Sequence, residues 1–225
     1  MTKLIDVLGF PSVNLDIGKR GSGKTATGCL ALEEAHGIGL NPYLMGLPKA
    51  KWDLLPDYIT PIKNINVVPD NSAILMDEAY TYCYSRDFPK AFNKFLNKTI
   101  GISRQKGWLL IIASHTCRKI DVGIILDADN LVIRQPSWLH VRYERQEIRE
   151  LVDQAAKFYN KCKEPIKWAY IYTEKGPVAM ELSLPKFWSS DLSNAFSGLT
   201  LDEIEIEKEE EEEEDDDKGK RLEDY

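Results

Sequence analysis

Eight residues near the start of the chain have types and a spacing suited to holding a phosphate group. They read GKRGSGKT and fit the pattern G-x-x-x-x-G-K-[ST]. Glycine lets the backbone adopt positive φ and leaves no Cβ in the path of a phosphate, so main-chain N–H groups can converge on the anion. The positions that we expect to line this site are Gly18, Lys19, Arg20, Gly21, Ser22, Gly23, Lys24, Thr25 and Ala26.

Two side chains of this turn have separate expected tasks. Lys24 should reach the β- and γ-phosphates of a nucleoside triphosphate and assist catalysis, and Thr25 should place its hydroxyl on Mg²⁺. We therefore predict ATP and Mg²⁺ as cofactors. The alternative interpretation is a flexible surface loop, rich in glycine and lysine, that binds nothing.

A pair of acids is expected to complete the magnesium site. Asp77 and Glu78 directly follow the apolar run 73–76, which is typical of a buried strand. Asp77 would hold Mg²⁺ through water, and Glu78 would act as general base on the attacking water. This strand should lie beside the strand that precedes the glycine-rich turn. Taken alone, an apolar run followed by two acids is weak evidence for a magnesium site, because many strands end in acids.

A third polar position should end a strand between those two and sense the γ-phosphate. The apolar strand 108–114 ends in Ser114, which His115 follows. We prefer His115 for this role because its ring reaches farther, and Ser114 is the alternative. Ordinary polarity where a strand meets a loop would also explain both residues.

The order of the predicted elements favours an α/β fold with a mostly parallel sheet. Strands are expected at 11–17, 42–47, 72–76, 108–114 and 130–134, and a hairpin at 168–173 and 178–182. Helices are expected at 25–36, 88–102, 118–126 and 141–161. Residues 48–69 are rich in proline and aspartate, which predicts surface loops with one helical turn near Trp52.

This succession of motifs resembles the additional-strand P-loop ATPases with a catalytic glutamate. The segment 97–116, NKTIGISRQKGWLLIIASHT, resembles the FtsK–HerA superfamily, and 120–135, IDVGIILDADNLVIRQ, is similar to a later passage of that family. The most similar members are compact genome-packaging ATPases of archaeal and membrane-containing viruses, and Zot-like phage assembly ATPases come next. The resemblance covers about residues 10–137 and implies a RecA-like P-loop NTPase fold.

The resemblance also implies a trans-acting arginine. Arg104 stands in an R-x-x-G-like context before the strand 108–114. The resemblance makes it the candidate arginine finger, which would act in a neighbouring subunit's site. A finger acting in trans requires a ring, for which we expect six subunits. The other arginines that could serve are Arg86, Arg118 and Arg134. The tip Ser-His-Thr departs from the Thr-Gln that ends this strand in many family members.

The function implied by the resemblance is ATP hydrolysis coupled to translocation of double-stranded DNA, most simply in viral genome packaging. Contact with DNA would be non-specific and through its backbone, and a capsid or portal protein is a further expected partner. A basic helix face could serve this contact or simply be solvated; its residues are Lys90, Lys94, Lys98, Arg104 and Lys106. The alternatives are a Zot-like assembly factor acting on protein and a P-loop kinase acting on a small molecule.

Composition sets the remaining expectations. The 225 residues are 43% hydrophobic and 29% charged, which is ordinary for a soluble globular protein. The longest apolar run, 108–114, is too short to span a membrane, and the N-terminus lacks the features of a secretion signal. The four cysteines form no CxxC pair. We therefore expect a cytoplasmic protein with buried thiols.

The C-terminal segment 201–225 differs in charge from the rest of the chain. It holds fifteen of the 36 acidic residues but four of the 29 basic residues, so the other 200 residues carry a net charge of +4. Nine successive acids, Glu209 to Asp217, repel one another and cannot pack. We expect a disordered tail after an ATPase domain at 1–200, whose core spans about 10–137 and whose extension of hairpin and helix spans 138–200.

Overall fold

The computed structural model describes residues 2–77, 88–115, 117–195 and 198. The predictions made for Glu78, Arg86 and the acidic segment 201–225 lie outside these residues.

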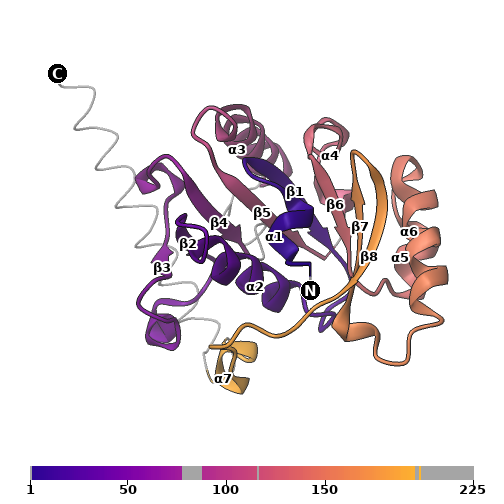
Figure 1. Cartoon of the computed structure of the whole chain (residues 1–225). Coiled ribbons are helices and arrows are strands. Elements are labelled where there is room, and N and C mark those ends of the chain that lie inside the picture. Colours follow the sequence, from indigo (N-terminus) through magenta and orange to yellow (C-terminus); the bar gives the residue numbers. More distant parts are fainter. Residues whose placement is uncertain (1, 78–87, 116, 196–197, 199–225) are drawn as a thin grey trace.

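Eight strands form one sheet in the order β3-β2-β4-β5-β1-β6-β7-β8 (Figure 1). Strands β1 to β6 pair in parallel, and β7 and β8 add an antiparallel hairpin at one edge. The predicted α/β fold with a mostly parallel sheet is confirmed. The strands are β1 (Ser12–Ile17), β2 (Asn41–Met45), β3 (Thr60–Ile62), β4 (Ser72–Met76), β5 (Leu109–Ser114), β6 (Asn130–Ile133), β7 (Trp168–Thr173) and β8 (Gly176–Glu181).

Helices cover both faces of the sheet because side chains alternate along each strand. In β1, Leu15 and Ile17 face the core under α3, α4 and α6; in β5, Leu109 and Ile111 face α1, α2 and α7. The α-helices are α1 (Leu4–Leu8), α2 (Lys24–His36), α3 (Phe88–Ser103), α4 (Val122–Asp127), α5 (Trp138–Tyr143), α6 (Gln146–Tyr159) and α7 (Ser190–Ser193). The short 3₁₀ helices are η1 (Lys49–Leu54), η2 (Ile65–Val67), η4 (Cys117–Lys119) and η5 (Pro165–Lys167).

Two predictions about local structure need correction. The single helix expected over 141–161 is two helices, because the backbone of Glu144 and Arg145 is not helical between α5 and α6. Glu144 is buried there, and Arg145 Nε donates to Cys117 O at 3.0 Å. The segment 48–69 contains a strand, β3, which pairs with β2.

Strand register brings four loops to one edge of the sheet. Ile17, the last residue of β1, pairs with Ser114 at the end of β5 and with Ile133 at the end of β6. Met76, the last residue of β4, pairs with Ile112 of β5. Strand β4, which Asp77 follows, was expected beside β1, but β5 lies between the two strands. The strand with the polar tip lies between them, as expected.

In the part of the chain that the structure describes, no helix is both long enough and apolar enough to cross a membrane.

Candidate active site

The turn between β1 and α2 has the backbone shape that its glycines predict. Gly21 and Gly23 have φ angles of +68° and +90°, which glycine adopts at little cost. A Cβ on Gly18 would lie 2.7 Å from Arg134 Cβ, so no side chain fits at that position. Helix α2 begins at Lys24, and its first N–H groups are therefore directed at the turn, as in an anion site.

Polar contacts hold Lys24 within the turn. Its ammonium group donates to Gly18 O at 3.0 Å and to Lys19 O at 3.2 Å. It also lies 3.0 Å from His115 Nδ1. An ammonium group can only donate, so His115 accepts through Nδ1 and carries its proton on Nε2. The structure thus brings together two of the predicted catalytic residues, Lys24 and His115.

Thr25 and Asp77 meet at the predicted magnesium position. Thr25 Oγ1 donates to Asp77 Oδ2 at 2.8 Å. The main-chain N–H of Asp77 donates to Met45 O at 2.9 Å and fixes the residue after β4. A hydroxyl and a carboxylate are hard oxygen donors, and Mg²⁺ typically takes one or two such protein ligands besides water and phosphate. These residues therefore fit the ion: Thr25 would bind it directly, and Asp77 would hold it through water.

A buried acid, Asp16, lies one residue before the end of β1. It is 1% exposed, and neither carboxylate oxygen has a hydrogen-bond partner among the described residues. Burial raises the pKa of Asp16 to about 7, although the cations of Arg134 and Lys24 oppose the shift. The charge beneath the turn therefore changes near neutral pH.

Arg134 supports the turn from inside the protein. Its Nε donates to Ser22 O at 3.0 Å, and its Nη2 donates to Ile166 O in η5. The residue is 2% exposed, so it cannot reach a neighbouring subunit, and its suggested role as an alternative finger is wrong. The sequence shows an arginine after a strand but not its burial.

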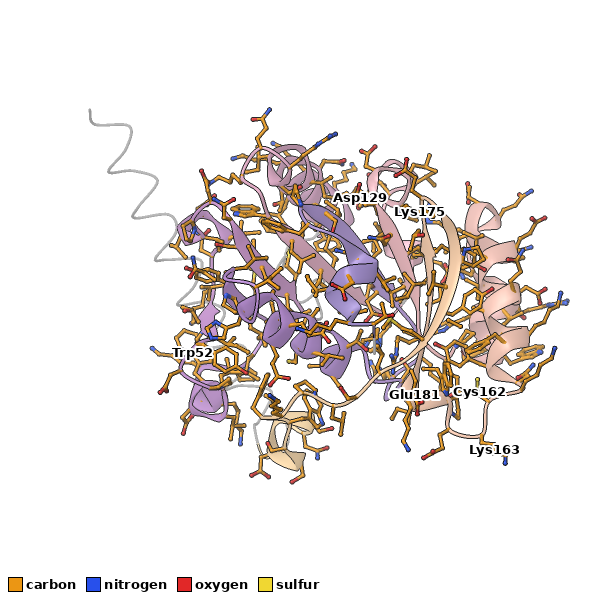
Figure 2. The ribbon with its side chains drawn as sticks, in the orientation of Figure 1. Trp52, Asp129, Cys162, Lys163, Lys175 and Glu181 are labelled. Carbon is orange, nitrogen blue, oxygen red and sulfur yellow. The ribbon has the colours of Figure 1, made fainter. Side chains whose placement is uncertain are left out.

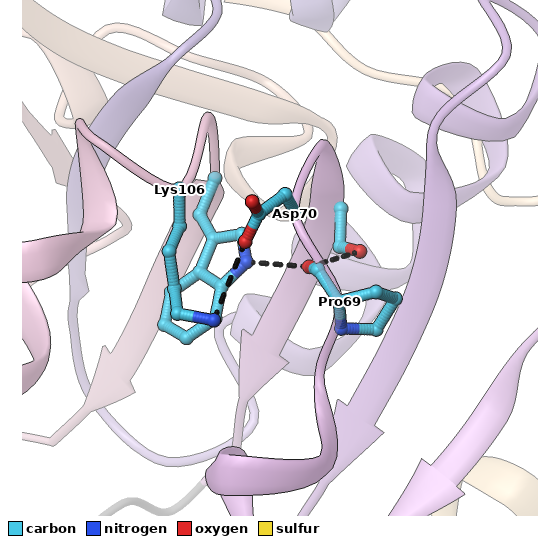
Figure 3. A network of polar contacts seen from close by, with 5 residues as sticks. Pro69, Asp70 and Lys106 are labelled. Atoms are coloured by element: carbon cyan, nitrogen blue, oxygen red, sulfur yellow. Dashed lines mark hydrogen bonds and ion pairs between the residues drawn. The ribbon is translucent and has the colours of Figure 1, made fainter.

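Arg104 lies far from the turn of its own chain. It is exposed and precedes β5, whose first residue pairs with the start of β1. The six residues of β5 span about 20 Å, which separates Arg104 from the turn. The loop at that end is fixed by Trp108 Nε1, which donates to Pro69 O at 2.8 Å, and by the pair of Lys106 and Asp70 at 3.3 Å (Figure 3).

The turn opens into a cleft of about 810 Å³, within the range of small-molecule sites. One side is lined by the turn and the other by apolar residues that no sequence motif identified: Ile166, Leu182, Leu184, Trp188 and Leu192. Proximity in the fold, rather than any spacing along the chain, identifies these residues.

A mostly parallel sheet with a G-x-x-x-x-G-K-T turn between β1 and α2 defines this chain as having the P-loop NTPase fold. Among solved structures, the genome packaging NTPase B204 from Sulfolobus turreted icosahedral virus 2, in complex with AMPPCP, is similar with a TM-score of 0.53 at 14% identity, over 77% of this chain and 98% of that one. The pCW3 conjugation coupling protein TcpA with ATPγS is similar with a TM-score of 0.51 at 13% identity, over 76% of this chain and 60% of that one.

These similarities confirm, at the level of the fold, the resemblance to genome-packaging ATPases that the sequence predicts. No protein-family profile matches the chain. No curated protein sequence matches it significantly.

Proposed function

We propose that this chain is an ATP-hydrolysing DNA translocase of the kind that packages viral genomes, acting in the host cytoplasm. The observation that carries the proposal is the convergence of Lys24, Thr25 and Asp77 at one edge of the sheet. Such a cluster suits a magnesium-bound triphosphate. Similar folds with bound ATP analogues in a genome packaging NTPase and a conjugation coupling protein support the choice.

In the proposed reaction, each residue of the site has one task. The N–H groups of the turn and Lys24 bind the β- and γ-phosphates, and Mg²⁺, when bound, neutralises charge on their oxygens. His115 accepts from Lys24, which leaves its Nε2–H to donate to a γ-phosphate oxygen or orient the attacking water. Glu78, the residue after Asp77, is proposed as the general base that takes the proton from this water.

We propose Arg104 as the finger acting on the neighbouring subunit. Because Arg104 lies at the opposite end of β5 from the turn, it can act only if another subunit presents it. A closed ring, which we propose to be a hexamer, gives every site one such arginine. Its guanidinium would stabilise charge on the γ-phosphoryl oxygens. The proposed ATPase domain spans 1–200 and is followed by the acidic segment 201–225.

DNA contact is proposed for the exposed face of α3. Lys90, Lys94 and Lys98 are exposed and four residues apart, so they share one face of the helix. Lys106, by contrast, is engaged by Asp70 and by the ring of Trp108. Lysines on one face can bind backbone phosphates without reading sequence. A capsid or portal protein is the proposed docking partner of the ring.

The test measures ATP hydrolysis by the full chain with and without double-stranded DNA, together with particle size in solution. We expect turnover from a ring-sized particle to rise when DNA is added, and Lys24→Ala to abolish it. Turnover that ignores DNA but responds to a virion protein would favour the Zot-like assembly factor. Phosphate transfer to a metabolite by a monomer would favour a kinase. Either outcome would rule out the translocase.

A further inference from the structure

The far wall of the cleft is formed by residues 182–195, which we call the strap. The hairpin returns the chain to the edge of the sheet where the turn lies: Figure 2 shows Glu181 at that end of β8, whereas Lys175 lies at the other end near Asp129. The strap therefore begins beside the turn. Figure 1 shows it crossing below α2 to reach α7.

Direct contacts connect the start of the strap to the turn. A Cβ on Gly23 would lie 3.6 Å from Ile166 Cγ1, so η5 touches the turn itself. The next residue, Lys167, accepts a hydrogen bond through its carbonyl oxygen from Leu182 N at 2.6 Å. Through η5, these contacts therefore fix Leu182, the first residue of the strap, close to the turn.

The middle and the end of the strap are anchored on α2 and on Tyr58, whose ring stacks on His36 of α2. Lys186 N lies 3.2 Å from both carboxylate oxygens of Glu33. The ring of Phe187 packs edge-on against Tyr58 at 6.2 Å between centroids, and Leu192 is 3% exposed in the core formed with α2. Anchors at both ends make the strap a preformed wall of the cleft.

The surface between the turn and the strap is apolar and partly exposed. Ile166 and Leu184 are 56% and 63% exposed, and Trp188 is half-buried beside them in the cleft. The same cleft continues to Gly21, Thr25 and Ala26. A ligand whose phosphates occupy the turn would therefore bring its remaining part against this apolar wall.

We propose that the strap, together with Ile166 of η5, is the nucleoside-binding subsite: Leu184, Trp188 and Ile166 enclose the base of the triphosphate that the turn holds. This inference rests on the proposed nucleotide site and adds its base specificity. Ser183 and Ser193 also line the cleft, and a hydroxyl can either donate or accept, so it fits adenine and guanine alike. We expect ATP and GTP to bind with affinities within about threefold, and pyrimidine nucleotides to bind several-fold more weakly because they bury less apolar surface.

The test compares ATP with inorganic tripolyphosphate, which has the phosphates but no nucleoside, by calorimetric titration of the full chain. Leu184→Ser and Trp188→Ala should each weaken ATP binding about tenfold and leave tripolyphosphate binding unchanged. Leu184 is exposed, so its replacement leaves the fold intact even if the Trp188 variant does not fold. Leu126→Ser, at a 75% exposed leucine of α4 outside the cleft, is the matched control and should change neither affinity.

The outcomes separate this inference from the proposed function. Equal affinity of the wild-type chain for ATP and tripolyphosphate, or unchanged ATP binding in the Leu184 variant, would overturn the strap subsite while the phosphate site stands. A wild-type chain that binds neither ligand would overturn the nucleotide site itself, and the strap subsite with it. Turnover indifferent to DNA would overturn only the translocase.

Discussion

At the scale of single residues, the contact between Lys24 and His115 determines what each side chain can do. Since Lys24 can only donate, His115 is oriented with Nδ1 toward the ammonium group and Nε2–H away from it. The end of β5 thus supplies a donor, His115 Nε2–H, whose direction is set by Lys24. Ser114, the alternative sensor, is buried at the end of β5.

Replacing His115 should therefore slow hydrolysis more than it weakens binding. We expect His115→Ala to lower kcat about 100-fold and to change KM for ATP less than threefold, as measured by steady-state phosphate release. His115→Gln should recover part of the rate because its amide can donate in place of Nε2–H. Loss of turnover in Ser114→Ala, with His115→Ala unaffected, would assign the sensor to Ser114 instead.

Asp16 should make stability depend on pH near neutrality. Its pKa of about 7 in the folded protein exceeds the ordinary value of 3.8, so between these pH values the folded state binds more protons than the unfolded state. The free energy of unfolding should fall as pH rises through this window, by about 1.4 kcal/mol for each unit of pKa difference, and level off above it.

Chemical denaturation at several pH values between 4 and 8 checks this expectation, with Asp16→Asn as the comparison. The asparagine variant does not titrate, so its stability relative to wild type should increase as pH rises through the window. A difference between the two proteins that is the same at every pH would show that Asp16 does not titrate there.

At the scale of elements, β1, the turn and α2 could be predicted because their determinants are local. Glycines permit the positive φ angles of the turn, and a short apolar run ends where the turn begins. The break between α5 and α6 could not be predicted, because Arg145 bonds to the distant Cys117 O. The strap lacks periodicity along the sequence, and the proposed role of its apolar residues follows only from contacts with η5 and α2.

Arg134 ties two elements together, and lysine should not replace it. Its guanidinium reaches both Ser22 O and Ile166 O, whereas lysine has one charged nitrogen and no planar fork. We expect Arg134→Lys to lower the free energy of unfolding by about 1–3 kcal/mol and to weaken ATP binding. Urea denaturation measures the first effect. Arg142→Lys, at an exposed position, is the control. An equal loss of stability in this control would contradict the claim that Arg134 stabilises the protein by connecting the turn to η5.

At the scale of the whole molecule, the distance between Arg104 and its own turn makes the proposed activity a property of the assembly. Arg104→Ala should bind ATP normally and lose most turnover, since no site in such a ring receives a finger. Mixing it with Lys24→Ala subunits, which keep the arginine but lack the phosphate contact, should restore part of the rate. If Arg104→Ala turned over ATP as fast as wild type, Arg104 would not be the arginine finger.

The antiparallel hairpin of β7 and β8 has a practical consequence for experiments that test the proposed translocation. Its tip at Lys175 lies at the end of the sheet remote from the glycine-rich turn (Figure 2), and a peptide inserted between Glu174 and Lys175 would project from that pole. A dye or surface tether placed there would lie far from the turn, so it could report movement of the proposed ring without contacting the candidate active site.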